Sequence, residues 1–252
     1  MKIVVPFKVV ADDQDIIVAS DESLDFSRAH KIVSTYDLNA LEAASQIATT
    51  EEGSSVVAIT VGDASIDDSK LKKNVLARGA SELFMTADDA CGNLDAFATS
   101  LELVKLLAKV GPYDLIVCGD GSSDVYAQQV EVQLAECLDL PCITAVCRIE
   151  ANGASIVVDR MLETEIETLE VTLPAVISVV PDSAVPRICG MKDILAAGKK
   201  PSNVFAADDA TPSKIEVIEE KAPKRVARKL EIFDATTDGD IDKFVAALKA
   251  AL

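Results

Sequence analysis

The stretch CGDGSSDVYAQQ, residues 118–129, groups glycine, serine and aspartate between an apolar run and a segment with helical spacing. A turn between a strand and a helix leaves backbone N–H groups free to bind an anion such as phosphate. Gly119 and Gly121 permit positive φ and close approach of the backbone, and Ser122 and Ser123 add hydroxyl donors. These residues predict phosphate binding, although a plain strand–helix turn has a similar composition.

The same stretch matches neither of the two common nucleotide-binding motifs. It is not G-x-G-x-x-G, and it is not a Walker A loop because no Gly-Lys-Ser/Thr follows. Asp124 is expected to cap a helix that continues through Gln128 and Gln129. Asp120 and Asp124 oppose a polyphosphate unless they face a ribose or cap backbone groups. The motif therefore does not indicate ATP hydrolysis by the Walker route.

Two further loops and the end of the first strand are expected at the same edge of the sheet. In a parallel sheet every strand delivers the loop that follows it to one edge. Pro6 follows the first strand, Tyr36 and Asp37 precede the first helix, and Val61 with Gly62 ends the second strand. We expect these loops to line an adenosine-sized crevice.

Catalytic and metal-binding groups are scarce along the chain. The six cysteines include no Cys-x-x-Cys pair, and Cys142 and Cys147 are expected on opposite faces of one strand. The single histidine, His30, lies in a polar loop and is expected to be solvated. We therefore predict no catalytic residue, no disulfide framework and no metal site, and a nucleotide in a structural or redox-carrier role.

The first half of the chain alternates short apolar runs with longer periodic segments, which is typical of a parallel sheet with crossover helices. The strands are expected at 2–10, 55–61, 82–86 and 114–118. The helices are expected at 36–48, 67–79, 92–111 and 124–141. Asp37, a residue near Asn93 and Asp124 are the expected caps, and Gly79, Gly111 and Pro141 are the expected ends.

The second half changes to successive β-rich runs. These are expected at 142–149, 154–162, 166–173 and 175–180, and Asn152-Gly153 is a strong hairpin signal. They predict an antiparallel extension of the sheet, followed by a loop and a short amphipathic helix in 181–201.

Residues 202–252 are predicted to form an arm with a terminal helix. Little periodicity is present from about 202 to 240, and the final segment at 240–252 has a stripe of apolar residues at helical spacing. The arm carries the basic cluster Lys221, Lys224, Arg225, Arg228 and Lys229, and the stripe consists of Ile241, Phe244, Val245, Leu248 and Leu252. The predicted domains are therefore 1–201 and 202–252, and the terminal helix docks either on its own domain or on a partner chain.

The charge of the chain limits its partners. The 252 residues carry a formal net charge of -18, which repels nucleic acid and anionic bilayers. No apolar run approaches the length that spans a membrane, and the N-terminus turns acidic without a cleavage site. We expect a cytoplasmic protein that binds proteins and small molecules, with no nucleic-acid partner and no membrane insertion.

Several of these segments together resemble a known family. The pieces YDLNALEAASQ, VLARGASEL, DLIVCGDGSSDVYAQQV, LDLP, ETLEVTLPAVISV and GMKDILAAGKKP follow one another in the order found in the beta (small) subunit of electron-transfer flavoproteins, in its Fix-type branch. The resemblance covers Met1 to about Pro201. It implies an α/β, parallel-sheet nucleotide-binding domain of the adenine nucleotide α-hydrolase-like type.

The resemblance also implies cofactors, partners and site residues. The family pairs this subunit with an alpha subunit that carries most of the FAD and exchanges electrons with acyl-CoA-type or other dehydrogenases. The subunit itself binds AMP or, in bifurcating members, a second FAD. Met191 matches the residue that docks on dehydrogenases, and Arg160 matches an arginine near the flavin. The implied nucleotide site consists of Pro6, Ser34, Tyr36, Asp37, Val61, Gly62, Gly119, Gly121, Ser122, Ser123, Asp124, Ala127, Gln128, Gln129 and Val130.

This chain departs from the family pattern at two places. Val125, Tyr126 and Val130 replace the acidic and hydroxyl residues common in the cradle, so one phosphate donor is lost, and Met161 replaces an acidic residue after Arg160. An alternative hypothesis is a stress-protein-type ATP-binding protein. The apparent lack of a lysine or arginine in the cradle argues against this alternative.

Overall fold

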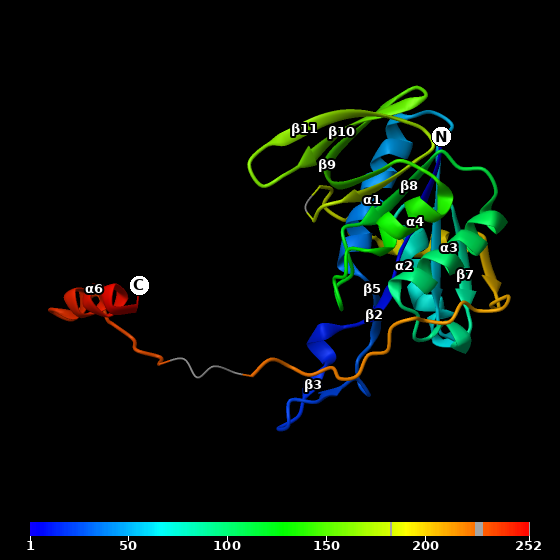
Figure 1. Ribbon diagram of the computed structural model, residues 1–252. Coiled ribbons are helices and arrows are strands. Elements are labelled where there is room, and N and C mark those ends of the chain that lie inside the picture. Colours follow the sequence, from blue (N-terminus) through cyan, green and yellow to red (C-terminus); the bar gives the residue numbers. More distant parts are fainter. Residues whose placement is uncertain (182, 225–228, 252) are drawn as a thin grey trace. The chain divides into compact units, whose positions relative to one another are not determined.

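The computed structural model describes residues 1–181, 183–224 and 229–251 (Figure 1). The chain forms two compact units, one of Met1–Ile17 with Asp25–Glu219 and one of Val18–Leu24 with Glu220–Leu252. Arg225 and Arg228 of the predicted basic cluster and Leu252 of the predicted stripe lie outside the described residues.

The first unit is built on a nine-stranded sheet with the order β11-β10-β9-β12-β8-β1-β6-β7-β13. Every pair of neighbours from β9 to β13 is parallel, and β10 is antiparallel to both β9 and β11. The strands are β1 (Lys2–Pro6), β6 (Ser55–Gly62), β7 (Glu82–Ala87), β8 (Leu115–Gly119), β9 (Cys142–Asn152), β10 (Ser155–Met161), β11 (Ile166–Thr172), β12 (Ala175–Val179) and β13 (Ser202–Phe205).

Helices cover both faces of this sheet because its central strands are apolar on both sides. In β1, Ile3 and Val5 pack on one face and Val4 packs on the other. The face of Ile3 is covered by α1 (Thr35–Thr50) and α2 (Ser69–Ala77). The face of Val4 is covered by α3 (Ala96–Val110) and α4 (Val130–Leu138), which lie on the same side of the sheet in Figure 1. A mostly parallel sheet with helices on both sides confirms the predicted α/β class.

Three of the four strands predicted in the first half are confirmed as β6, β7 and β8. The strand predicted at 2–10 instead ends at Pro6, because the Lys8 amide donates to the Asp37 carboxylate rather than to a neighbouring strand. The chain then forms β2 (Val9–Ala11), which pairs with β5 (Lys31–Val33). A second small sheet contains β3 (Ile17–Val18) and β4 (Leu24–Asp25), and the 3-10 turns are Asp13–Asp15, Ala64–Ile66 and Asp89–Cys91.

The helices α2 and α3 agree with prediction apart from one cap. Asp68 caps α2, whose Leu71, Val75 and Leu76 are buried. The cap of α3 is Asp95 rather than a residue near Asn93, because the Asp95 carboxylate accepts the Ala98 N–H at 2.7 Å. Gly111 ends α3 with φ of 79°, as glycine permits.

The predicted antiparallel extension is confirmed, and β9, β10 and β11 reach out from one end of the sheet (Figure 1). Gly153, with φ of 65°, lies in the turn between β9 and β10, as the Asn152-Gly153 signal predicts. The outermost strand, β11, carries Glu167 and Glu170. The short helix predicted after the strands is α5 (Met191–Ala197).

The edge strand β13 is a finding that the sequence pattern did not predict. Ser202–Phe205 pairs in parallel with β7, although we expected the arm to begin at residue 202. The Asn203 side chain donates to Glu82 Oε1 at 2.8 Å, and the Phe205 ring stacks on Phe84 with centroids 6.3 Å apart. The chain therefore rejoins the sheet after α5, and the division into domains at residue 201 stays a prediction.

The second unit contains α6 (Asp240–Ala251), which confirms the predicted terminal helix. Its Ile241, Phe244, Val245 and Leu248 are all exposed, and the Phe244 ring contacts Phe233 edge-on at 5.8 Å. A cavity of about 400 Å³ lies between Phe233 and this helix. Whether α6 docks on its own domain or on a partner stays a prediction. Among the described residues no helix combines the length and apolarity needed to cross a bilayer.

Candidate functional site

The strand order places a topological switch point between β1 and β8. From β1 the chain adds β6 and β7 on one side, and it then returns to add β8 and β12 on the other side. In open α/β sheets, ligands bind outside the carboxyl ends of the strands at such a point. The loop after β1 begins at Phe7 and the loop after β8 begins at Asp120, so these two loops flank the switch point.

The start of α1 joins both loops through Ser34 and Asp37. The Asp37 carboxylate accepts the Lys8 N–H at 2.7 Å and is also hydrogen-bonded by the Gly119 N–H and the Ser34 hydroxyl. Ser34 Oγ accepts the Ser123 N–H at 3.3 Å. Three segments that are distant in sequence therefore meet at this point: the loop after β1, the start of α1, and the end of β8 with the loop that follows it.

Asp37 does not cap α1, so the prediction of that role is wrong. Ser34 is the N-cap residue, and Asp37 lies in the first turn with its carboxylate turned toward Lys8 and Gly119. Burial raises the pKa of Asp37 to about 7, against the lowering effect of the Lys8 and Gly119 N–H groups. The carboxylate ties the end of β8 to the start of α1 instead of satisfying helix amides.

Gly119 permits a close approach of strand and helix, as predicted, but not through positive φ. A Cβ atom at Gly119 would lie 2.7 Å from Asp37 Oδ1 and 2.8 Å from the carbonyl carbon of Tyr36. Neither Gly119, which lies within β8, nor Gly121, which lies in a bend after it, has positive φ. A side chain at Gly121 would meet the Tyr126 ring at 2.4 Å.

The loop of residues 120–129 is held by contacts among its own side chains. Tyr126 Oη donates to Asp120 Oδ2 at 2.5 Å, and Gln128 Nε2 donates to the same oxygen at 3.1 Å. The hydrogen bond to Asp120 raises the pKa of Tyr126 to about 12. The Tyr126 ring also packs on the Tyr36 ring with centroids 4.9 Å apart. The loop is therefore ordered against both β8 and α1.

The helix predicted at 124–141 begins only at Val130, so the predicted capping role of Asp124 is wrong. Tyr126 and Gln128 have φ of 50° and 52°, which interrupts a helix. The Asp124 carboxylate accepts the Val125 N–H at 2.8 Å and pairs with Lys8 Nζ at 2.6 Å. Ordering of the loop against α1 and the loop after β1 explains the late start of α4.

Lys8 is a candidate site residue that the sequence prediction missed. Its side chain is 49% exposed and its ammonium lies against Asp124 in the loop. The expectation that the cradle has no nearby cation is therefore wrong. Lys8 follows the carboxyl end of β1 by two residues, so the shared edge of parallel strands was the signal that could have located it.

The first turn of α4 presents backbone N–H groups without a side-chain cap. Gln129 occupies the N-cap position and makes no capping hydrogen bond with its side chain. Residues 123–129 are exposed, so both Ala127 and Gln129 are open to solvent, and Val130 is partly buried. Helix N-termini of this kind attract anions. Together with the Ser123 hydroxyl and Lys8, this turn can hold a phosphate group, whereas the Ser122 hydroxyl, predicted as a donor, donates to Asp124.

The remaining predicted residues lie at the same edge without direct contacts to the loop. Pro6 is buried and pairs with Ile59 of β6. Val61 and Gly62 end β6, and the Gly62 carbonyl accepts the Asp88 N–H at 3.0 Å. The structure thus brings the loop after β8, the start of α1 and the loop after β1 together, and it places Val61 and Gly62 one strand beyond β1.

The two predicted partner-facing residues lie on other elements. Arg160 is on β10, where its Nη1 lies 3.8 Å from Glu167 Oε2 and its Nε is buried without a hydrogen-bond partner. Glu167 of β11 therefore supplies the acidic neighbour that Met161 cannot. Met191 begins α5 and is 80% exposed.

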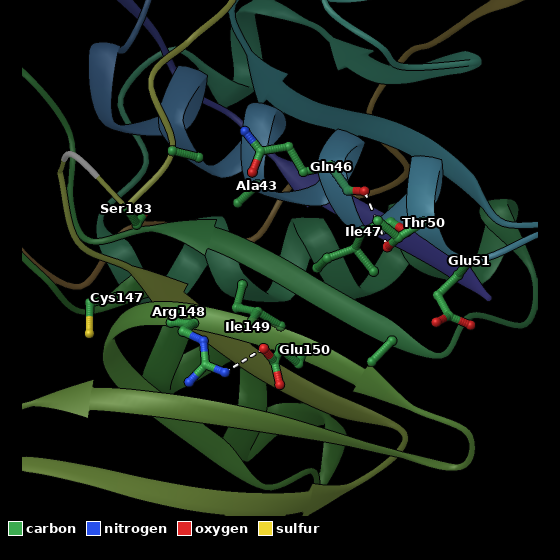
Figure 2. A pocket seen from close by; sticks show the side chains of 12 residues that line it. Ala43, Gln46, Ile47, Thr50, Glu51, Cys147, Arg148, Ile149, Glu150 and Ser183 are labelled. Atoms are coloured by element: carbon green, nitrogen blue, oxygen red, sulfur yellow. Dashed lines mark hydrogen bonds and ion pairs between the residues drawn. The ribbon is translucent and has the colours of Figure 1, made fainter.

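A cavity of about 440 Å³ between α1 and β9 is an alternative location for a ligand (Figure 2). Its cation, Arg148, is paired with two carboxylates, those of Glu150 and of Asp159 at 2.9 Å, whereas Lys8 is paired with one. In residues 1–181, 183–224 and 229–251, no group of three or more metal-ligating side chains lies together. The switch point, where Lys8 lies against the loop that leads into the uncapped start of α4, is the stronger candidate for an anion.

A comparison with protein-family models matches residues 23–210 to the electron transfer flavoprotein domain. The match covers more than half of the chain, and it includes the start of α1, the loop after β8, β10 and α5. Members of this family are electron-transfer proteins that bind flavin. Because the matched residues cover most of a mostly parallel α/β sheet, the chain belongs to the electron transfer flavoprotein family.

Proposed function

We propose that this chain is the beta (small) subunit of a heterodimeric electron-transfer flavoprotein of the Fix-type branch. It binds an adenine nucleotide, AMP or a second FAD, and it carries electrons between dehydrogenases and an acceptor with an alpha subunit. The observation that carries this proposal is the junction at the switch point, where Ser34, Asp37 and Lys8 meet the loop after β8. Its proposed setting is the cytoplasm.

The residues at the junction fit an adenylate. The N–H groups of Ala127, Gln129 and Val130, at the uncapped start of α4, are placed to bind the phosphate, and Lys8 adds a positive charge. The Ser123 hydroxyl is a further donor, and the Ser122 hydroxyl would become one on leaving the Asp124 carboxylate. The adenosine would be lined by Pro6, by Ser34 to Asp37 and by Val61. Asp120 and Asp124 favour a ligand with few negative charges at this position.

The flavin of the alpha subunit would supply the redox chemistry by taking up and releasing electrons. This chain contributes Arg160, whose guanidinium is partly exposed on β10 beside Glu167. A guanidinium can donate to the polar edge of a neighbouring flavin ring. The role of the beta subunit is therefore to bind, orient and enclose, and no residue of its own is oxidised or reduced.

An exposed apolar patch beside α5 supports the proposed docking of an acyl-CoA-type or other dehydrogenase. Ile188 is 97% exposed, Met191 is 80% exposed, and Leu195 lies one turn further along α5 and is also exposed. Methionine adapts to different apolar pockets because its side chain is flexible and polarizable. Met191 is therefore suited to contact more than one partner.

Nucleotide counting tests this function directly. The chain is purified alone and with its alpha subunit, the bound nucleotides are extracted and counted per chain, and AMP and FAD binding is measured by calorimetry. A colourless chain with AMP indicates the simple type, and a yellow chain with FAD indicates a second flavin. A folded chain that binds neither nucleotide and forms no complex with the alpha subunit would overturn the proposal.

The same calorimetry addresses ATP binding of the stress-protein type. The Lys8 ammonium beside the loop is the one observation that favours a more highly charged phosphate group. Tighter binding of MgATP than of AMP or FAD, together with self-dimerisation, would support that alternative. We expect AMP or FAD to bind more tightly because the carboxylates of Asp120 and Asp124 repel a triphosphate.

A further inference from the structure

Glu131, the second residue of α4, has a buried carboxylate at the start of the helix. The residue is 4% exposed, and its carboxylate accepts a hydrogen bond from its own backbone N–H. In the described part of the chain it forms no ion pair and no hydrogen bond with another side chain. A buried carboxylate without a cation is costly and calls for an explanation.

The groups around Glu131 are acidic or neutral. Asp120 follows β8, is 7% exposed and repels Glu131, and Cys118 of β8 and Cys142 of β9 are close enough to interact with its charge. Tyr126 of the loop also interacts with its charge, and the cation Arg160 of β10 interacts with Cys142. Burial, aided by Asp120, raises the pKa of Glu131 to about 7.

A further polar group faces the same region without a partner. Ser178 of β12 is fully buried, its Oγ has no hydrogen bond, and it pairs in register with Cys118. Because Cys118 and Val176 pack on the face that α4 covers, Ser178 faces α4 as well. The layer beneath the start of α4 therefore contains an unused hydroxyl beside an acidic pair.

The carboxylate of Glu131 takes the position that a helix N-terminus offers to an anion. The side chain of the N-cap residue Gln129 accepts from Gln133 Nε2 at 3.1 Å and makes no capping hydrogen bond, and the Glu131 N–H is satisfied by the Glu131 side chain. The first-turn amides and the helix dipole would otherwise favour an external anion. Glu131 thus serves as an internal substitute for a phosphate oxygen.

We propose that Glu131 competes with the nucleotide phosphate for the first turn of α4, so that it is a specificity-determining residue of the nucleotide site. The inference rests on the proposed function, because it concerns the same ligand. When Glu131 is ionised it holds its own amide and repels phosphate, and when it is protonated it frees that amide and can donate a hydrogen bond. Phosphate binding is therefore coupled to uptake of one proton above neutral pH, and ligands of low charge are preferred.

The test is calorimetric titration of the full chain with AMP at pH 6 and pH 8, for the wild type and for Glu131→Gln. Glu136→Gln is the matched control, since Glu136 is exposed on the same helix. Titrations in buffers of different ionisation enthalpy count the protons taken up. Circular dichroism checks that each variant is folded.

We expect Glu131→Gln to bind AMP about tenfold more tightly than the wild type at pH 8 and nearly equally at pH 6. The reason is that ionisation of Glu131 lowers the AMP affinity of the wild type about tenfold for each pH unit above the pKa of Glu131. The ratio of the AMP affinities of the two proteins at each pH does not depend on the titration of AMP itself. The wild type takes up close to one proton at pH 8 and Glu131→Gln takes up less, while Glu136→Gln behaves as the wild type.

Equal AMP affinities of wild type and Glu131→Gln at both pH values would overturn this inference and leave the proposed function intact. Absence of AMP and FAD binding in every folded protein would instead overturn the proposed function, and the inference with it. The proton count of the wild type needs no substitution. It decides the question even if Glu131→Gln fails to fold, since a count near zero at pH 8 contradicts the coupling.

Discussion

At the scale of single residues, Asp37 joins the end of β8, the start of α1 and the loop after β1 through one carboxylate. Each of its hydrogen bonds comes from a donor that fixes a different segment. Since burial outweighs these bonds in their effect on the pKa, the folded protein holds the proton of Asp37 more tightly than the unfolded chain does. The junction is therefore sensitive to pH.

Asp37→Asn is expected to remove one component of the pH dependence of stability. An acid whose pKa is raised from 3.8 to about 7 by folding makes the free energy of unfolding fall as pH rises between those values. Urea unfolding at intervals between pH 4.5 and pH 7.5 measures this slope. We expect a shallower slope for Asp37→Asn than for the wild type, and identical slopes would contradict the burial argument.

Lys8→Met is expected to weaken AMP binding roughly fivefold, corresponding to about 1 kcal/mol for a partly exposed charge-assisted contact. Lys8 is the cation that the structure brings to the loop, and its loss also frees Asp124 to repel phosphate. Lys73→Met, at an exposed position on α2, changes the net charge equally and serves as control. An equal loss in both variants would mean that only the overall charge matters.

At the scale of elements, the contact between β8 and α1 depends on the missing side chain of Gly119. Gly119→Ala places a Cβ atom against Asp37 and Tyr36, and the required shift is expected to cost roughly 1–3 kcal/mol of stability. Gly198→Ala is the control, because its backbone is helical and its nearest contacts are at 3.6 Å. Denaturant midpoints measure both, and equal stability of the two variants would argue against the close approach.

Substitution in α5 is expected to separate docking from folding. Met191→Ala removes an exposed side chain, so the thermal midpoint and the nucleotide content should not change. Electron transfer from a dehydrogenase should fall at least threefold, which is a usual loss for an apolar contact at an interface. Ile166→Ala, exposed on β11, is the control. Normal electron transfer by Met191→Ala would remove α5 from the docking surface.

The elements and their order could largely be predicted from the sequence, because apolar runs and periodic segments carry that signal. The start of α4 could not, since Tyr126 and Gln128 leave the helix only where the loop meets α1 and Asp120. The strand β13 was missed because four residues are too few for a period. Within the candidate site, the sequence predicted that Ser34 and Gly119 lie at the same edge of the sheet. The burial of Glu131 could not be predicted, because it depends on packing that no local pattern encodes.

At the scale of the whole molecule, both apolar clusters are formed by residues between Met1 and Phe205. A chain truncated after Glu219 is therefore expected to keep its thermal midpoint within about 3 °C of the full chain. Truncation after Lys200 removes β13 with the contacts of Asn203 and Phe205, and should lower the midpoint further. Calorimetry compares the two, and equal midpoints would place the domain boundary at residue 201.

β11 is the outermost strand at one edge of the nine-stranded sheet. A free strand edge is a template for pairing with another molecule, and acidic side chains placed there discourage it. Glu167 and Glu170 give this edge a negative charge in a chain whose net charge is already -18. This charge disfavours the addition of a strand from another molecule, so the β11 edge is protected against edge-to-edge self-assembly.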